Sequence, residues 1–150
     1  MSGTYCNLIY HVIFSTKNRY PLITQAIQSD LHAYLGGIVR EREGIALIVG
    51  GMPDHIHMLL KLKPKFAVSD VIRDVKAVSS KWINETKEGF RKFGWQDGFA
   101  AFTVSQSQFE AVYEYIQNQE LHHRGIDYQS ELRSLLAKNQ IPYDEATIWN

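Results

Sequence analysis

Two histidines separated by one residue are the part of this sequence most suited to chemistry. His55 and His57 lie in the segment Asp54-His55-Ile56-His57, within a longer stretch where apolar and polar residues alternate. In a β-strand, side chains two positions apart point to the same face, with their Cα atoms about 6–7 Å apart. Two imidazoles at that spacing can bind one divalent metal ion. The simpler interpretation is a solvated strand face, so a second signal is needed.

A tyrosine and a glutamine one helical turn apart provide the second signal. Tyr115, Gln119 and His122 fall at positions i, i+4 and i+7, so they share one face of a predicted helix. Gln119 could add an amide oxygen to two imidazoles, leaving metal positions open for a phosphate. A metal would also favour the phenolate of Tyr115, since a free phenol has a pKa of about 10. A half-buried tyrosine beside a solvated glutamine is the plainer alternative.

Hydrophobic periodicity predicts the elements that position these residues. Apolar and polar residues alternate in the strands predicted over residues 5–15 and 55–63. Two further strands are predicted, one over the short apolar segment 45–49 and one over residues 99–104. Apolar residues recur at helical spacing in the predicted helices, which begin at N-caps Thr24, Ser69 and Ser107, with a last helix over residues 130–138. We expect Gly50-Gly51 and Pro53-Asp54 to be turn residues before the histidine strand, and residues 84–94 to form a loop.

The order of these elements predicts the fold class. Strand, helix, strand, strand, helix, strand is the order of an α+β, ferredoxin-like (RRM-like) domain, a four-stranded antiparallel sheet with helices on one face. A C-terminal helix carrying Tyr115 follows the sheet. We expect the sheet face that bears His55 and His57 to be free for function.

Length and composition limit the class of protein. The chain has 150 residues, 45% of them hydrophobic, and we expect one domain over residues 1–150. No apolar run approaches the roughly 18 residues of a membrane span, and no signal peptide is recognisable. The single cysteine, Cys6, predicts a reducing cytoplasmic location without disulfides, with the thiol buried in the first strand.

Several motifs resemble one family. Pro53-Asp54-His55-Ile56-His57 resembles the His-hydrophobic-His motif of the HUH nuclease superfamily, and residues 115–119 resemble the tyrosine helix of its single-tyrosine, IS200-like transposases. Other segments resemble the same family in the same order, namely residues 10–17, 95–102, 118–124 and 143–145. The resemblance covers nearly the whole chain, although each motif alone is short.

The resemblance implies a DNA transposase that cleaves and rejoins single-stranded DNA at hairpin-bearing element ends. It implies that Tyr115 attacks a DNA phosphate, leaving a 5′-phosphotyrosine link and a free 3′-hydroxyl. It also implies that His55, His57 and Gln119 bind Mg²⁺ or Mn²⁺, although imidazoles usually favour later transition metals. Members are homodimers in which one subunit's tyrosine helix can complete the other's site. We expect the same here, in the cytoplasm and on the nucleoid when DNA is bound.

The charge distribution fits this expectation only locally. The net charge is zero, but residues 61–96 carry nine Lys or Arg against four Asp or Glu. The lysines expected to contact DNA phosphates are Lys61, Lys63, Lys65, Lys76 and Lys81. A solvated helix face explains the same run without DNA. His122 and His123 could join the metal site or simply suit a helix C-terminus.

Two other functions fit parts of the pattern. A non-catalytic module that binds single-stranded DNA or RNA could use the same sheet, but it needs exposed aromatic residues where His55 and His57 stand. A histidine-triad-like nucleotide hydrolase would need a further histidine at the position of Leu59. A domesticated relative of a mobile element is compatible with every motif.

Overall fold

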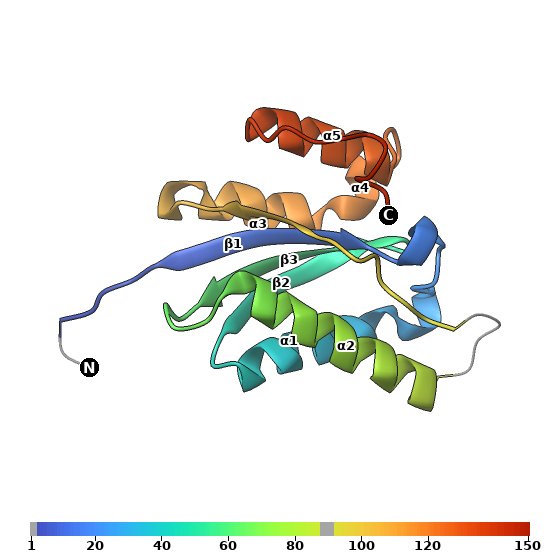
Figure 1. Ribbon diagram of the computed structural model, residues 1–150, viewed down its shortest axis with the longest axis horizontal. Helices are drawn as coiled ribbons and strands as arrows, with labels where there is room; N and C mark the ends of the chain where they lie inside the picture. Colours follow the sequence, from blue (N-terminus) through green and yellow to red (C-terminus); the bar gives the residue numbers. More distant parts are fainter. Residues whose placement is uncertain (1–2, 88–91) are drawn as a thin grey trace.

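Four strands form an antiparallel sheet in the computed structural model, which describes residues 3–87 and 92–150 (Figure 1). The strands are β1 (Leu8–Ser15), β2 (Ile45–Met52), β3 (His55–Leu62) and β4 (Ala100–Thr103). Their spatial order is β2-β3-β1-β4, so β3 is a central strand and β2 an edge strand. The predicted α+β, ferredoxin-like class is confirmed. The histidine strand therefore lies in the middle of the sheet, where helices can cover it.

Helices lie on both faces of the sheet (Figure 1). One face carries α1 (Gln25–Glu41) and α2 (Val68–Thr86). The other face carries α3 (Phe109–Gln117), α4 (Gln119–His122) and α5 (Tyr128–Lys138), and short 3₁₀ turns, η1 (Lys17–Arg19) and η2 (Gln106–Gln108), lie in the connections. The histidine face is therefore covered instead of open, and the side chains of His55 and His57 are fully buried. Among the described helices, none is both long and apolar enough to cross a bilayer.

The face toward α1 and α2 holds the larger apolar core. The even positions of β3 point into it, as the alternation predicts, and Met58 and Leu60 have no exposed surface. Val12 and Phe14 of β1 lie beside them. The helices complete this core with apolar residues at helical spacing, namely Leu31, Leu35, Val71, Ile72 and Val75.

The Gly-Gly pair lies inside β2 and not in a turn, which corrects the sequence prediction. Pro53 and Asp54, which the sequence also marks as turn residues, form the turn. Gly50 faces α3 so closely that a Cβ there would lie 2.6 Å from the backbone oxygen of Ile116. Gly51 has a φ of +146°, a backbone conformation that other residues rarely adopt. Both glycines therefore serve the close approach of strands and helix.

Several helix starts differ from the prediction. Ala67 is the N-cap of α2, so Ser69 lies within its first turn, and η2 includes Ser107 before α3 begins. Asp127 caps α5 by accepting a hydrogen bond from the Ser130 backbone N–H at 2.9 Å. Thr24 does occupy the N-cap of α1, although its side chain makes no capping bond.

The flanking segments show two further differences. β1 begins at Leu8 and not at residue 5, which leaves Cys6 exposed instead of buried. α2 continues to Thr86, into the range predicted to be a loop; residues 88–91 of that range lie outside the described residues. These differences lie at element ends, away from His55 and His57.

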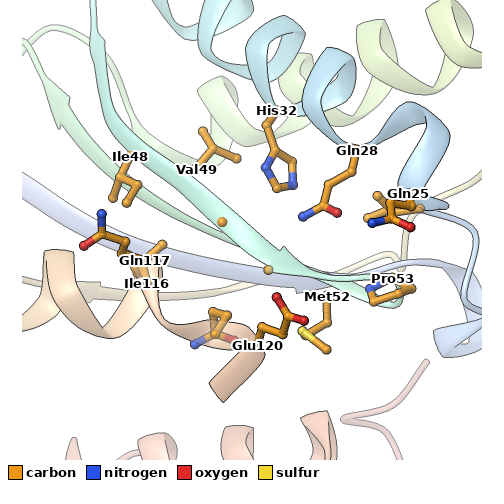
Figure 2. A pocket seen from close by; sticks show the side chains of 14 residues that line it. Gln25, Gln28, His32, Ile48, Val49, Met52, Pro53, Ile116, Gln117 and Glu120 are labelled. Atoms are coloured by element: carbon orange, nitrogen blue, oxygen red, sulfur yellow. The ribbon is translucent and has the colours of Figure 1, made fainter. Parts of the chain in front are cut away.

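A pocket of about 520 Å³ opens beside the edge strand (Figure 2). Its walls come from α1, from β2 with the following Pro53, and from the junction of α3 and α4. Gln119 lines this pocket and also reaches the buried histidines, so the pocket adjoins the candidate site.

Candidate active site

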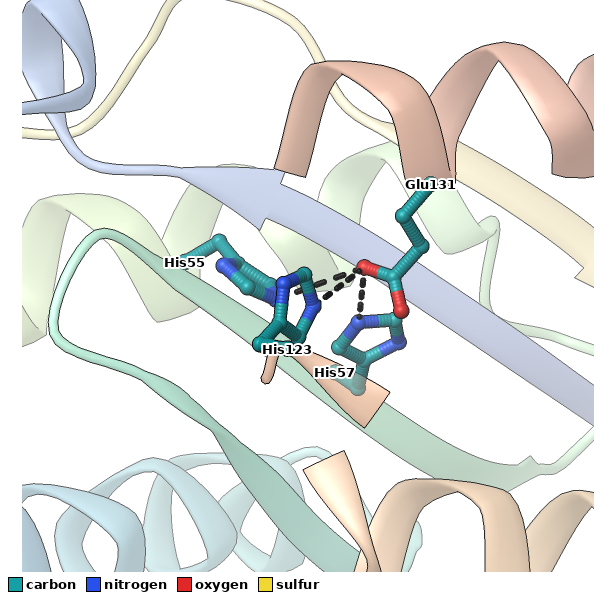
Figure 3. Close-up of side chains that lie close together, drawn as sticks. All are labelled: His55, His57, His123 and Glu131. Carbon is teal, nitrogen blue, oxygen red and sulfur yellow. Dashed lines mark hydrogen bonds and ion pairs between the residues drawn. The ribbon is translucent and has the colours of Figure 1, made fainter. Parts of the chain in front are cut away.

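Three histidines and a glutamate converge between β3 and α5 (Figure 3). His55, His57, His123 and Glu131 each offer a ligand atom, and these atoms lie within 4.8 Å of one another. Glu131 Oε1 lies 3.0 Å from His57 Nε2, 3.1 Å from His123 Nε2 and 3.4 Å from His55 Nε2. Imidazole nitrogens and a carboxylate oxygen gathered in this way are a donor set that fits a divalent metal ion.

Local structure explains why these side chains meet. The period of two in β3 directs His55 and His57 to the face that α5 covers. Leu132 and Leu136 dock α5 against Ile13 and Phe102 of the sheet. Glu131 precedes Leu132 on that buried side, and only 2% of its surface is exposed. Apolar packing on α5 therefore holds a carboxylate over the two strand imidazoles.

Tyr115 and Gln119 reach the same cluster within one chain. The Tyr115 hydroxyl donates a hydrogen bond to Glu131 Oε2. Gln119 Oε1 lies 3.1 Å from His55 Nε2, and Gln119 Nε2 donates to Glu131 Oε2 at 3.2 Å. The four residues that the sequence singled out for chemistry, Tyr115, Gln119, His55 and His57, are thus brought together.

The two C-terminal histidines differ in position. His123 Nε2 lies 3.1 Å from Gln119 Oε1, inside the cluster. His122 is exposed and lies against the Tyr115 ring, with 4.5 Å between ring centroids. The sequence left open whether either histidine joins the metal site. In the structure, His123 belongs to the group that could hold a metal, whereas His122 lies beside Tyr115.

Charges in the cluster are strongly coupled. Burial disfavours a charged His55, yet its hydrogen bonds to Asp54 and Glu131 outweigh burial and raise its pKa to about 9. Burial alone would raise the pKa of Glu131, but hydrogen bonds from His55 and His57 hold it well below its usual range. At neutral pH, a cationic His55 therefore lies between two carboxylates when no metal is bound.

His11 of β1 extends the cluster behind His57. His11 Nε2 lies 2.8 Å from His57 Nδ1, and the two rings stack. Burial lowers the pKa of His57 to about 4 and that of His11 to about 3, so both imidazoles are neutral at pH 7. A partner on Nδ1 fixes the ring orientation and leaves Nε2 directed at Glu131.

The candidate DNA-binding lysines do not surround this cluster. Lys63 and Lys65 form ion pairs with Glu43 beyond the far end of β3. Lys76 and Lys81 lie on α2, on the other face of the sheet (Figure 1). The Lys76 ammonium donates hydrogen bonds to backbone carbonyls of the segment after Trp95, those of Gln96, Asp97 and Gly98. Lys61 and Lys81 are exposed.

Comparison with known proteins assigns the family. Residues 4–119 match the family described as "Transposase IS200 like", and the chain belongs to this family of DNA-processing enzymes. It is similar to the ISDra2 transposase TnpA of Deinococcus radiodurans, with 26% identity over 78% of this chain and 87% of the relative. It is also similar to the IS200 transposase of Salmonella typhimurium, with 30% identity over 79% of this chain and 81% of the relative.

Solved structures share the fold. A crystal structure named as that of a transposase from Deinococcus radiodurans R1 aligns with a TM-score of 0.64 and 24% identity, covering 79% of this chain and 95% of that one. A REP-associated tyrosine transposase, bound to a REP hairpin in its structure, aligns with a TM-score of 0.61 and 18% identity, covering 82% of this chain and 73% of that one. At these identities the likeness supports the fold alone.

Two residues of the site were missed from the sequence. Glu131 lies on the buried side of α5 beside Tyr128 and Leu132, where an apolar residue is expected, and that interruption was the available signal. His11 likewise interrupts the odd-numbered apolar positions Ile9 and Ile13 of β1. A polar residue at a predicted apolar position can therefore indicate a buried polar network instead of an error in the predicted pattern.

Proposed function

We propose that this transposase cleaves and rejoins single-stranded DNA with Tyr115 as the nucleophile and a divalent metal held by the histidine cluster. One observation carries the proposal: the Tyr115 hydroxyl is hydrogen-bonded to the same Glu131 carboxylate that contacts His57. The nucleophile therefore lies next to the groups that would hold the ion. Family membership supports the reaction class.

The proposed chemistry is a transesterification at phosphorus. The Tyr115 oxygen bonds to phosphorus while the bond from phosphorus to the 3′ oxygen breaks, giving a 5′-phosphotyrosine and a 3′-hydroxyl. The proton that Tyr115 releases is balanced by the proton that the departing 3′ oxygen takes up. In the reverse direction a 3′-hydroxyl attacks the phosphotyrosine, so rejoining needs no external energy.

Glu131 keeps the nucleophile oriented before the reaction. Burial, together with the nearby carboxylate, raises the pKa of Tyr115 above its ordinary value, so the hydroxyl stays protonated and donates its hydrogen bond. A bound metal would supply Lewis-acid stabilisation of the phosphate and of the developing phenolate. Glu131 thus acts as a hydrogen-bond acceptor that directs the hydroxyl toward the cluster.

The proposed ligands are His55, His57 and Gln119, with His123 and Glu131 close enough to add to them. Mg²⁺ or Mn²⁺ is the proposed ion. The nitrogen-rich donor set favours Mn²⁺ of the two, because Mg²⁺ prefers oxygen ligands and water.

The proposed substrate is single-stranded DNA with a hairpin, and the proposed assembly is a homodimer. A structural relative bound to a REP hairpin supports the substrate class. Exposed Lys61 and Lys81 are proposed phosphate contacts, together with Lys63, Lys65 and Lys76. Mixing Tyr115→Phe with His57→Ala subunits recovers cleavage if two chains share a site; strictly monomeric behaviour would contradict the dimer.

The decisive test is covalent capture. Labelled hairpin DNA incubated with the protein and Mn²⁺ should give an adduct that survives denaturation and maps to Tyr115. Tyr115→Phe should abolish it, whereas Tyr113→Phe, two residues earlier on α3 and also half-buried, should retain it. DNA binding without any adduct would favour a non-catalytic single-strand module instead, and an adduct formed by Tyr115→Phe would show a different nucleophile.

A further inference from the structure

The pocket beside β2 lies one strand away from the histidine cluster. Gly50 pairs with His57 and Met52 pairs with His55, across strands about 4.8 Å apart. Gln119 belongs to both places, since it lines the pocket and its Oε1 lies 3.1 Å from His55 Nε2. A group in this pocket would therefore be a near neighbour of a phosphate at the cluster.

The lining of the pocket is unsuited to a phosphate. None of its 14 lining residues is a lysine or arginine, and its single carboxylate is that of Glu120. An anion would gain no ion pair here and would meet a negative charge. The ligand that fits this lining is uncharged.

The same lining is rich in hydrogen-bonding groups that lack partners. The side chains of Gln25, Gln28 and Gln117 make no hydrogen bond within the described part of the chain. A carboxamide offers a donor and an acceptor together, which matches the edge of a nucleobase. Figure 2 shows Gln28 extending from α1 into the pocket. These amides are free to pair with an incoming base.

His32 provides an independent sign of a missing ligand. Its Nε2 is buried and has no hydrogen-bond partner among the described residues, whereas nearly all buried polar atoms in folded proteins have one. Its ring points from α1 into the pocket beside Gln28 (Figure 2). Burial lowers the pKa of His32, so its imidazole is neutral and can both donate and accept.

Resting on the function proposed above, we infer that this pocket binds one unpaired nucleobase of the DNA strand, next to the phosphate that Tyr115 attacks. Ile48, Met52 and Pro53 would contact the faces of the base, and the amides and His32 would read its edge. The volume of about 520 Å³ is ample for one base. The pocket would thereby select the base beside the cleavage position.

The inference is tested by binding alone, so it does not depend on cleavage. The probes are fluorescent hairpin oligonucleotides with single-stranded flanks of dA, dC, dG or dT, bound to Tyr115→Phe protein. An abasic site is then moved through the tightest-binding flank. We expect one position at which losing the base weakens binding about tenfold, the usual scale for one base contact.

Variants of the pocket identify what reads that base. The Gln28→Ala and His32→Leu variants should each bind DNA with intact and abasic flanks with affinities within about twofold of each other. The base has little effect once the side chain that contacts it is gone. Gln108→Ala, an exposed glutamine at the N-cap of α3, should keep the tenfold difference. If the abasic site has no effect, or the same effect in all three variants, the assignment of the pocket is wrong, while the proposed cleavage by Tyr115 is unaffected. If the protein does not bind the DNA at all, both the pocket assignment and the proposed function are wrong.

Discussion

The two faces of this sheet are made by the same strands and differ in what they bury. Toward α1 and α2, β3 directs Met58 and Leu60 into an apolar core. Toward α3, α4 and α5, the alternate positions direct His55 and His57 into a polar network closed by Glu131. An apolar face needs only volume and shape, whereas each buried polar atom also needs a partner.

The difference separates stability from chemistry. Burial of apolar side chains stabilises the fold in proportion to the area removed from water. A buried network of imidazoles and carboxylates gains little stability, because lost hydration offsets most of its internal attraction. The polar face is therefore best explained by what it can bind. Substitutions on the two faces should have separable effects.

Substitution of a histidine should have the largest effect, on activity. His57→Leu removes a proposed metal ligand and should reduce the cleavage rate by at least ~10³-fold. The proposed ligands act as a unit, so losing one removes most of the catalytic effect of all of them. The free energy of unfolding without metal should fall by only about 1–3 kcal/mol, because leucine fills the space of the imidazole but leaves His11 Nε2 and Glu131 Oε1 without one buried hydrogen-bond partner. Adduct yield and urea unfolding measure the two effects. Substantial remaining cleavage would show that the polar face is not the reactive one.

Truncation on the apolar face should show the reverse pattern. Leu60→Ala should lower the free energy of unfolding by about 2–5 kcal/mol, because Leu60 is completely buried. Adduct formation per folded molecule should stay within about twofold of wild type, since Leu60 points away from the cluster. Val78→Ala, at a side chain with 40% of its surface exposed, is the matched control. A large loss of activity in folded Leu60→Ala would mean that the faces are not separable.

The polar face should also make stability depend on pH when metal is removed by a chelator. The raised pKa of His55, about 9, means that its stabilisation is complete below pH 6.5 and is lost as the pH rises toward 9. The lowered pKa values of His57 and His11 act oppositely, so stability rises between about pH 4 and 6.5. Urea unfolding should show a maximum near pH 6.5. His55→Gln should remove the alkaline decline, and a wild-type protein equally stable at pH 6.5 and 9 would contradict the assignment.

The smallest effects concern the lysines of α2. Lys76→Met should lower the free energy of unfolding by about 1–2 kcal/mol, because its ammonium holds the backbone carbonyls of Gln96 and Asp97. Lys81→Met should leave stability within ~0.5 kcal/mol. If Lys81 contacts a phosphate, its loss should reduce the salt dependence of single-strand binding by about 0.7 in log–log slope. An unchanged slope would exclude Lys81 from the DNA interface.

Periodicity predicted much of this molecule because it depends only on local spacing. The alternation around His57 correctly separated the apolar core positions from those of the polar cluster. Helical spacing brought Tyr115 and Gln119 to that cluster, although the single helix it predicts is interrupted at Asn118, between α3 and α4. The position of α5 depended on contacts between Leu132 and the sheet, which no local pattern contains. Glu131 could therefore be recognised only after α5 was docked. Gly50 was misassigned because a turn and a close helix contact both favour glycine.

The absence of a side chain at position 50 has a consequence for the reach of Tyr115, the proposed nucleophile. Any side chain there would push Ile116 away from the strand. Tyr115 is the preceding residue, so a shift of α3 at this point would also disturb the contact between its hydroxyl and the Glu131 carboxylate. Gly50 thus works as a spacer that sets how far the proposed nucleophile reaches toward the cluster.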